Sequence, residues 1–347
     1  MENGNSSTGQ NILIVSDAWE PQVNGVVTTL TNTAKEIQNL GYNIDTLTHL
    51  DCDTKWQTPY PDVVLAIPKK KVIKSKIKNA NAVHISTPEG TIGKKVVKYC
   101  DKHQIPYTTG YHTKWPEFLN SMFGLSKKIT HKYLKNVHRN SKAILVPTET
   151  AKQELCNEGY QNVKVQTRGV KREQFTFNDK PQDFLVCVSR VSKEKNLEKF
   201  CELKTTSKKI LVGDGPHLKT LQNRYDDVLF VGLKKGSQLA EFYRNAKCFV
   251  FPSKADTFGV VMIEAMACGT PVAAYPVTGP IDVVDQGQTG WLDDDLSQAI
   301  EHASKLDRKE VYKQSQKWTW KASAEDFVNS FGVYESLSYV KYYSLDT

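Results

Sequence analysis

The stretch NILIVSDAWEPQVNGVVTTLTNTAKEIQNLGYNIDTLT, residues 11–48, contains a complete strand–helix–strand unit. It begins with the short apolar run ILIV, which is typical of a buried strand. Apolar residues then recur at helical spacing, at Val27, Leu30, Ala34, Ile37 and Leu40. Gly41 ends the predicted helix, and NIDTLT is the next predicted strand. This order predicts a βαβ unit of a parallel sheet.

The same pattern recurs along the rest of the chain. In the first half the further predicted strands are AVHIST, PYTTGYHT and KAILVPT. A second series follows the polar stretch 171–183, with the predicted strands FLVCVSR, KKILVGDGP, VLFVG, CFVFPS and PVAAYP. The chain of 347 residues is also longer than one core usually serves. The sequence therefore predicts two successive α/β units.

We expect an α/β fold of two Rossmann-like domains, residues 1–170 and 171–347, whose parallel sheets face a central cleft. A final helix from about residue 318 follows the last strand and could pack on either domain. Ligands of open parallel sheets bind at the carboxyl ends of the strands. The sequence thus places the expected site between the two domains.

Composition predicts a globular, reduced protein without a membrane span. Hydrophobic residues make up 39% and charged residues 24%, and no apolar run approaches the ~18 residues that cross a bilayer. The polar start MENGNSSTGQ has no basic or apolar region of a signal peptide, so we expect a disordered tail. The seven cysteines are scattered without a C-x-x-C pair, which favours apolar filling over disulfides or zinc. The expected location is cytoplasmic.

Positive charge is concentrated in the first half. Residues 1–170 contain 22 Lys and Arg against 14 Asp and Glu, whereas the rest of the chain contains 24 of each. The excess is either a drift in surface lysines or a surface that faces an anionic partner. Its densest part is PKKKVIKSKIK, residues 68–78, where Val72, Ile73 and Ile77 lie among the lysines. If helical, this segment could lie on an anionic membrane, and a solvated basic loop is an equal alternative.

Common nucleotide and metal motifs are missing from the sequence. Neither predicted domain opens with G-x-G-x-x-G, and no P-loop motif occurs, which disfavours a dinucleotide or P-loop site. The acidic runs DCD (51–53) and DDD (293–295) are predicted to be loops rather than metal ligands. We therefore expect no metal and no cofactor.

Two cations follow the first predicted strand of the second domain. In SRVSKEKN, Arg190 and Lys195 lie at the expected edge of the sheet, where they could hold a diphosphate. Lysine and arginine on a loop are more often only solvated. The position of this loop is what favours a binding role.

The segment DTFGVVMIEAMACG joins a loop to a predicted helix. Phe258, Gly259 and Val260 lie at the helix N-terminus, where free N–H groups attract phosphate. Asp256 precedes the helix and could accept hydrogen bonds from sugar hydroxyls, although a helix cap would also explain it. Glu264 lies among apolar residues that are expected to bury it, and burial of a carboxylate without a function would be costly. The two acids could bind opposite ends of one nucleotide-sugar.

Single residues elsewhere add weaker signals. His112 follows a predicted strand and is a candidate for contacting a reacting group in the cleft. Gly25 precedes a helix, where the backbone could approach a phosphate closely. Gly213 and Gly215 in VGDGP form a similar tight loop.

Together these motifs resemble the family 4 glycosyltransferases, retaining enzymes of the GT-B fold. The resemblance spans nearly the whole chain and includes, in the expected order, EPQVNGVVTTL, VHISTPEGTIG, YHTKWPEFL, RGV, SRVSKEKN, VGDGP, FVFPS, DTFGVVMIEAMACGTPVAAYP and GWL. Its most specific part is the pair of acids separated by seven residues, in which Asp256 stands where many relatives have Glu. Lys171 departs from the GVD pattern that is frequent in the family, so no role is carried over to it.

The resemblance implies roles for matching residues. Arg190 and Lys195 would bind the donor diphosphate, and Glu264 would bind the ribose. Asp256, Thr257, Phe258 and Gly259, with Val260 after them, would face the transferred sugar and the phosphates. Gly25 and Gly213 would lie near the donor, and His112 beside the reacting sugar.

The implied reaction moves a hexose or hexuronic acid from a nucleotide diphosphate, expected to be UDP, to an acceptor hydroxyl with retained configuration. The motifs PQVNGVV and YHT resemble enzymes that glycosylate diacylglycerol. The expected acceptor is therefore a lipid at the cytoplasmic face of the membrane, with the protein bound there peripherally. A polysaccharide and a small soluble acceptor remain alternatives.

Two other functions compete with transfer. A nucleotide-sugar epimerase on the same fold would turn over donor without any acceptor. A nucleic-acid-binding protein would use the basic first half, but no recognition motif accompanies the charge, so no nucleic-acid partner is expected.

Overall fold

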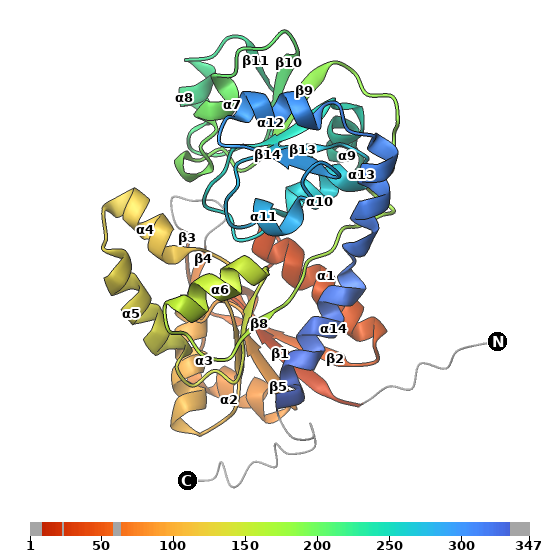
Figure 1. The fold of residues 1–347 in the computed structure, drawn as a ribbon. Coiled ribbons are helices and arrows are strands. Elements are labelled where there is room, and N and C mark those ends of the chain that lie inside the picture. The colour runs from red at the N-terminus through yellow and green to blue at the C-terminus, as the bar shows by residue number, and fades with distance from the viewer. Residues whose placement is uncertain (1–8, 23, 58–63, 334–347) are drawn as a thin grey trace, which may run out of the picture. The chain divides into compact units, whose positions relative to one another are not determined.

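The computed structural model describes residues 9–22, 24–57 and 64–333. Most of the predicted N-terminal tail lies outside the described residues. The described residues form two compact units, one from those up to 116, from 125 to 167 and from 320 onwards, and the other from 117–124 and 168–319. Each unit contains a six-stranded, wholly parallel sheet covered by helices on both faces (Figure 1).

The sheet of the first unit has the strand order β2-β1-β5-β6-β7-β8. Its strands are β1 (Asn11–Val15), β2 (Asn43–Leu47), β5 (Ala82–Ile85), β6 (Thr108–Gly110), β7 (Ile144–Val146) and β8 (Val163–Val165). Its helices are α1 (Gly25–Asn39), α2 (Lys70–Lys78), α3 (Thr91–Lys102), α5 (Lys127–His138), α6 (Glu149–Asn157) and α14 (Trp320–Ser330). The antiparallel hairpin β3 (Thr54–Gln57) and β4 (Val64–Ile67) lies outside this sheet, and α4 spans Trp115–Phe123.

The apolar run of β1 is buried on both faces of the sheet. Leu13 and Val15 pack into a core with residues of α2 and α3. Ile12 and Ile14 pack into a second core with residues of α1 and α14. Successive side chains of a strand point to opposite faces, so a strand covered on both faces needs continuous rather than alternating apolar residues.

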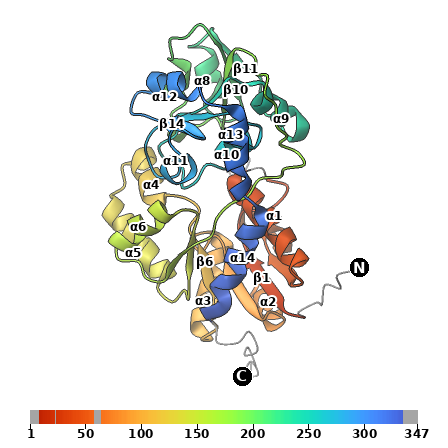
Figure 2. The same ribbon diagram turned by 45° about the vertical axis from the view of Figure 1, so that its right-hand side comes forward.

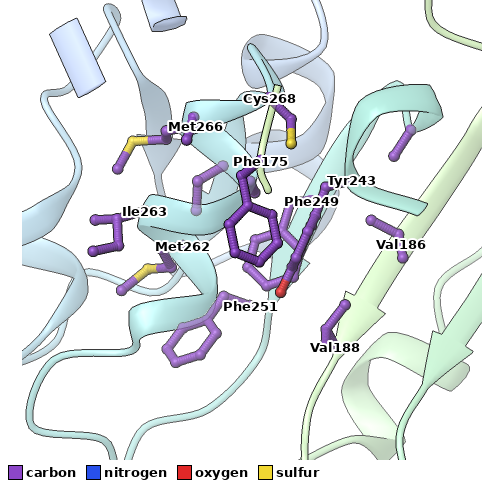
Figure 3. Close-up of a cluster of buried hydrophobic side chains, with 14 of the residues drawn as sticks. Phe175, Val186, Val188, Tyr243, Phe249, Phe251, Met262, Ile263, Met266 and Cys268 are labelled. Carbon is purple, nitrogen blue, oxygen red and sulfur yellow. The ribbon is translucent and has the colours of Figure 1, made fainter. Parts of the chain in front are cut away.

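The sheet of the second unit has the order β11-β10-β9-β12-β13-β14. Its strands are β9 (Phe184–Val188), β10 (Lys208–Val212), β11 (Val228–Phe230), β12 (Cys248–Phe251), β13 (Val272–Ala274) and β14 (Gly290–Leu292). Its helices are α7 (Glu198–Cys201), α8 (Leu218–Gln222), α9 (Gly236–Asn245), α10 (Val260–Ala267), α11 (Pro280–Val283), α12 (Leu296–Ala303) and α13 (Arg308–Gln314). Figure 3 shows the core on one face, where Tyr243 and Phe249 pack beside Met262 and Met266 of α10.

The last helix, α14, returns to the first unit and packs along α1 (Figure 1, Figure 2). Ala324 and Phe327 lie in the same core as Leu30 and Ile37 of α1. Asp326 accepts a hydrogen bond from the backbone N–H of Thr167 at 2.9 Å, close to the point where the chain leaves the first unit. The chain therefore passes between the units near residue 167 and again near residue 319, besides the short excursion of residues 117–124 into the second unit.

The basic segment that was expected to be either a helix or a loop forms α2. Its apolar residues Ile73 and Ile77 are buried in the core, and Val72 packs against it. Lys76 pairs with Asp45 at 2.7 Å, and Lys69 pairs with Asp53 at 2.6 Å. The apolar side of α2 thus packs in the protein interior. If α2 lay on a membrane, which was one of the two alternatives predicted from the sequence, it would present lysines without apolar side chains to the bilayer.

Candidate functional site

Two adjacent loops of the second unit bring Lys195 and Asp256 together. One loop follows β9, the other follows β12, and these strands are neighbours in the sheet. Lys195 Nζ donates a hydrogen bond to Asp256 Oδ1 at 2.6 Å, and both side chains are about four-fifths buried. Asn196 adopts a left-handed conformation (φ 54°) and donates to the carbonyl of Pro252, which fixes one loop to the other.

The carboxylate of Asp256 is held ionised with one oxygen available. Burial alone would raise the pKa of Asp256, but the charge and hydrogen bond of Lys195, the hydroxyl of Ser253 and the charge of Arg190 together lower it below its usual range. Oδ2 of Asp256 is buried and has no hydrogen-bond partner in the described part of the chain. A buried, ionised oxygen of this kind is an acceptor for a donor group of a ligand, such as a sugar hydroxyl.

Arg190 is oriented by Glu194 in the same loop. Arg190 Nη2 donates to Glu194 Oε1 at 2.7 Å, and Ser192 Oγ donates to the same oxygen at 2.6 Å. Burial would raise the pKa of Glu194, but these two hydrogen bonds, the charge of Arg190 and a backbone hydrogen bond lower it. Since a guanidinium carries five N–H donors, Arg190 keeps capacity for an anion after binding Glu194.

Gly213 and Gly215 support the Arg190 loop. Both have positive φ angles, 145° and 155°, in the region that favours glycine. A Cβ on Gly213 would overlap the carbonyl oxygen of Ser189, and one on Gly215 would overlap that of Val191. The sequence singled out these glycines for a close approach to phosphate, and the structure gives them a close approach to the neighbouring loop.

Helix α10 begins beside Asp256 without a side-chain cap. Its N-cap residue is Gly259, which has a φ of 85°, and a Cβ there would crowd Phe251 and Met262. The preceding Phe258 is buried and packs edge-on against Trp318. An uncapped helix start offers N–H groups and the positive end of the helix dipole to an anion.

Glu264 lies in the middle of α10, next to the aromatic core. Tyr243 donates its hydroxyl hydrogen to Glu264 Oε2 at 3.0 Å, and Figure 3 shows Tyr243 beside α10. Burial raises the pKa of Glu264 to about 7, against the lowering effects of the Tyr243 hydrogen bond and of Lys171. The charge of Lys171, a residue to which the family resemblance gave no role, thus contributes to lowering the pKa of Glu264.

In the first unit, Gly25 is the first residue of α1. Oδ1 of Asn24 accepts hydrogen bonds from the backbone N–H groups of Val26 and Val27 at 3.1 and 3.0 Å. The start of α1 is therefore already capped by a side chain, unlike that of α10. A Cβ on Gly25 would meet no atom within 4 Å, so packing does not require glycine there.

His112 follows β6 at the carboxyl edge of the same sheet. Its ring lies against Gly110, where a Cβ would come within 2.6 Å of Nε2 and 2.7 Å of the carbonyl oxygen of Ser86. The absence of a side chain at Gly110 therefore makes the space that His112 occupies.

Two acids that sequence analysis did not single out lie at this edge of the first sheet. Asp17 follows β1 and accepts hydrogen bonds from Thr87, Thr91 and the backbone N–H groups of Ile92 and Gly93, which fixes the start of α3.

Glu89 follows β5 and accepts a hydrogen bond from Trp115 Nε1 at 2.8 Å. Burial raises the pKa of Glu89 to about 7. Glu89 could have been identified as a candidate site residue from the sequence, because it follows a predicted strand in STPEGTIG.

The acidic runs have structural partners. Asp51 ends a short 3₁₀ helix and accepts a hydrogen bond from the backbone N–H of Thr48. Asp295 caps α12 by accepting from the backbone N–H of Ser297. Across residues 9–22, 24–57 and 64–333, no three His, Cys, Asp or Glu side chains are grouped in a way that could hold a metal ion.

Two family models match successive parts of the chain. The model described as "Glycosyltransferase Family 4" matches residues 23–174, and the model described as "Glycosyl transferases group 1" matches residues 169–318. The second match contains the Arg190 loop, the Asp256 loop and α10.

Relatives with similar sequences span most of the chain. The GDP-mannose-dependent alpha-mannosyltransferase of Mycobacterium tuberculosis is 24% identical over 317 residues, which cover 82% of this chain and 84% of that protein. The alpha-monoglucosyldiacylglycerol synthase of Acholeplasma laidlawii is 23% identical over 322 residues, which cover 75% of this chain and 78% of that protein.

Solved structures with similar folds cover nearly all of the chain. Sucrose-phosphate synthase from Thermosynechococcus elongatus has a TM-score of 0.74 at 20% identity, and the match covers 93% of this chain and 98% of that one. Anabaena HepE, in a complex with UDP and glucose, has a TM-score of 0.69 at 15% identity, covering 93% and 99%. These similarities confirm the GT-B fold predicted from the sequence.

Proposed function

Because this chain belongs to the family 4 glycosyltransferases, we propose that it transfers a hexose or hexuronic acid from a UDP-sugar to diacylglycerol with retained configuration. The observation that carries the proposal is the Lys195–Asp256 pair beside Arg190 and the uncapped start of α10. These groups offer cations and N–H donors to a diphosphate, and one ionised acceptor to a sugar. A nucleotide diphosphate sugar is the ligand that needs both.

The donor diphosphate would lie against Arg190, Lys195 and the N-terminus of α10. Two cations and a helix end can balance the charge that develops on the leaving diphosphate, which replaces the role of a metal ion. The ammonium of Lys195 is already held at 2.6 Å from Asp256, so it would be positioned before the donor diphosphate binds.

The sugar and the ribose would be recognised by the two acids. Asp256 Oδ2 is an ionised acceptor for a sugar hydroxyl. Glu264, with a pKa of about 7, accepts hydrogen bonds from the ribose diol when it is deprotonated. Tyr243 occupies one of its oxygens, which leaves the other for the ribose.

Transfer then proceeds on one face of the sugar. The bond from the anomeric carbon to the diphosphate oxygen breaks, and the acceptor hydroxyl oxygen forms a bond to the same carbon from the same side. The leaving diphosphate takes the proton of the acceptor. The transition state has oxocarbenium character, which the carboxylate of Asp256 would stabilise from nearby.

Diacylglycerol is the proposed acceptor because two independent features favour a lipid. The similar protein of Acholeplasma laidlawii is named for synthesis of monoglucosyldiacylglycerol. The net positive charge lies entirely in residues 1–170, and a cationic surface suits an enzyme that works on an anionic membrane at its cytoplasmic face. Among the described helices none is long and apolar enough to span a bilayer.

Nucleotide release would test this function directly. Each of a panel of UDP- and GDP-sugars is supplied with and without diacylglycerol in anionic vesicles, and products are analysed for glycolipid. We expect release from a UDP-hexose that rises only with diacylglycerol. A response to a GDP-sugar alone would replace the proposed donor with the type that the mycobacterial relative is named for. Slow hydrolysis without any response to lipid would exclude diacylglycerol and favour a saccharide or a small alcohol.

A further inference from the structure

Helix α5 has apolar side chains on two of its faces. One face, including Thr130, Leu134 and Val137, is buried in the first unit. The other face is exposed: Leu125, just before the helix, is 48% exposed, Ile129 69% and Tyr133 42%. Residues four apart follow one another along a single face of a helix. Ile129 and Tyr133 therefore lie in a line on one exposed face of α5, and Leu125, outside the helix, extends this line of exposed apolar side chains at its N-terminal end.

Lysines surround this line. Lys128 and Lys132 of α5 are both exposed. The neighbouring helix α3 contributes Lys94, whose ammonium lies 5.1 Å from the centre of the Tyr133 ring. Lys95 is also exposed, one position further along α3.

The two helices that contribute these side chains contain a single acidic residue. Residues 125–138 contain no Asp or Glu, and α3 contains only Asp101. Asp101 already accepts hydrogen bonds from Tyr107 and Asn140. We call Leu125, Ile129 and Tyr133, with Lys94, Lys128 and Lys132, the α5 surface.

We propose that the α5 surface docks on an anionic lipid bilayer. An exposed apolar line flanked by lysines matches the boundary of a membrane, where acyl chains meet negative headgroups. Lysine can place its aliphatic stem against the acyl region while its ammonium stays at the headgroups, and tyrosine has the same amphipathic character. The positive charge beside the apolar line argues for this occupant over an uncharged protein surface.

This surface differs from the basic segment singled out by sequence. In α2 the residues Ile73 and Ile77 are buried, so α2 combines lysines with no exposed aliphatic side chain. In α5 the lysines and the exposed apolar residues occur together. Docking through α5 would therefore combine electrostatic attraction with burial of apolar surface in the bilayer. Docking through α2 would depend on electrostatic attraction alone.

Sedimentation with lipid vesicles tests the proposal without any sugar donor, so its outcome does not depend on the proposed reaction. We compare vesicles of phosphatidylcholine with vesicles that also contain phosphatidylglycerol. The wild type is expected to bind the anionic vesicles more tightly, and to keep part of that binding when salt is raised from about 0.1 M to about 1 M, where the Debye length falls to about 3 Å.

Three paired variants locate the surface. Leu125→Ser with Ile129→Ser should weaken binding at least about tenfold, because two apolar side chains no longer enter the bilayer. Lys128→Gln with Lys132→Gln should weaken it by roughly fivefold for each lysine. The matched control, Lys70→Gln with Lys71→Gln on α2, removes the same charge and should change binding by less than about twofold.

All of these positions are exposed, so each variant should keep the melting temperature of the wild type. Equal losses for the two lysine pairs, with no loss for the apolar pair, would show that only total charge matters and would overturn the proposal. Failure of the wild type to bind any vesicle would do the same. If the Leu125 and Ile129 changes instead abolished self-association in the ultracentrifuge, the α5 surface would be a subunit interface.

Discussion

The ammonium of Lys195 lies 2.6 Å from the carboxylate of Asp256, although the two residues are 61 positions apart in the chain. The contact joins the loops after two neighbouring strands, and the helix that begins at Val260 starts just beyond it. Lys195 keeps the carboxylate of Asp256 ionised at a partly buried position, where an unpaired carboxylate would be costly.

Replacing Lys195 by Ala should lower kcat/KM for the donor about 100- to 1,000-fold, because one cation of the proposed diphosphate site is lost. The unpaired carboxylate of Asp256 should then recover a higher pKa. Steady-state kinetics with the responding donor would measure the effect, and a thermal melt would show that the fold persists. Lys199→Ala is the control: Lys199 pairs with Glu202 on the surface, and its loss should change kcat/KM less than about twofold. Equal activity of Lys195→Ala and Lys199→Ala would show that Lys195 does not belong to the donor site.

Donor affinity should rise between pH 6 and pH 8, because the carboxyl of Glu264, with a pKa of about 7, accepts hydrogen bonds from ribose more strongly when it is deprotonated. Calorimetric titration with the nucleoside diphosphate would measure this dependence. Glu264→Gln should bind more weakly and lose the part of the pH dependence that comes from the carboxyl, while the part that comes from the terminal phosphate of the ligand, which titrates at about pH 6, remains.

Tyr243→Phe provides a second test of the role of Glu264. It removes the hydrogen bond that lowers the pKa of Glu264, so the midpoint of the pH dependence should move upward. A wild-type profile with the same shape as that of Glu264→Gln would contradict a ribose-binding role for Glu264.

Gly25→Ala should lower activity without lowering the stability of the fold. No atom lies within 4 Å of the added Cβ, so the melting temperature should stay close to that of the wild type. If the donor diphosphate approaches the backbone of Gly25, as the family resemblance implies, the methyl group should still lower kcat/KM. Gly213→Ala is the contrasting variant, since its Cβ would overlap the Ser189 carbonyl, and it should lower stability as well. Full activity of Gly25→Ala would exclude a close approach of the phosphate there.

Buried His138 should make the protein less stable in acid. Burial lowers its folded-state pKa to about 4, below the ordinary 6.5, so over this range the unfolded chain binds a proton that the folded chain does not. Its contribution to the free energy of unfolding is therefore kept above pH 6.5 and lost as the pH falls towards 4, by roughly 3 kcal/mol at most.

Urea unfolding at several pH values would measure this loss. The comparison variant is His138→Gln, which can still hydrogen bond with Thr109 but cannot titrate. Identical pH slopes for the two proteins would show that His138 contributes nothing. Burial raises the pKa values of Glu89 and Glu264, so these two groups make the protein more stable as the pH falls. The effect of His138 is therefore the difference in free energy of unfolding between the wild type and His138→Gln at each pH.

The sequence by itself determined the architecture and the composition of the candidate site. Continuous apolar runs such as ILIV in β1, alternating with helical patterns, predicted two parallel α/β units because such strands must be covered on both faces. The motifs around Arg190, Lys195 and Asp256 were visible because each lies in one short loop after a strand. These are local signals, which hydrophobic spacing and loop position carry directly.

Only the tertiary structure decided which side chains meet and which face inward. The contact of Lys195 with Asp256 depends on the adjacency of β9 and β12, which strand patterns do not specify. The raised pKa of Glu264 depends on burial beside Tyr243. The helices α2 and α5 both contain lysines and apolar residues, yet the apolar residues of α2 pack inside while Ile129 of α5 remains exposed. Burial is a property of the packed chain, since each side chain competes with all others for the interior.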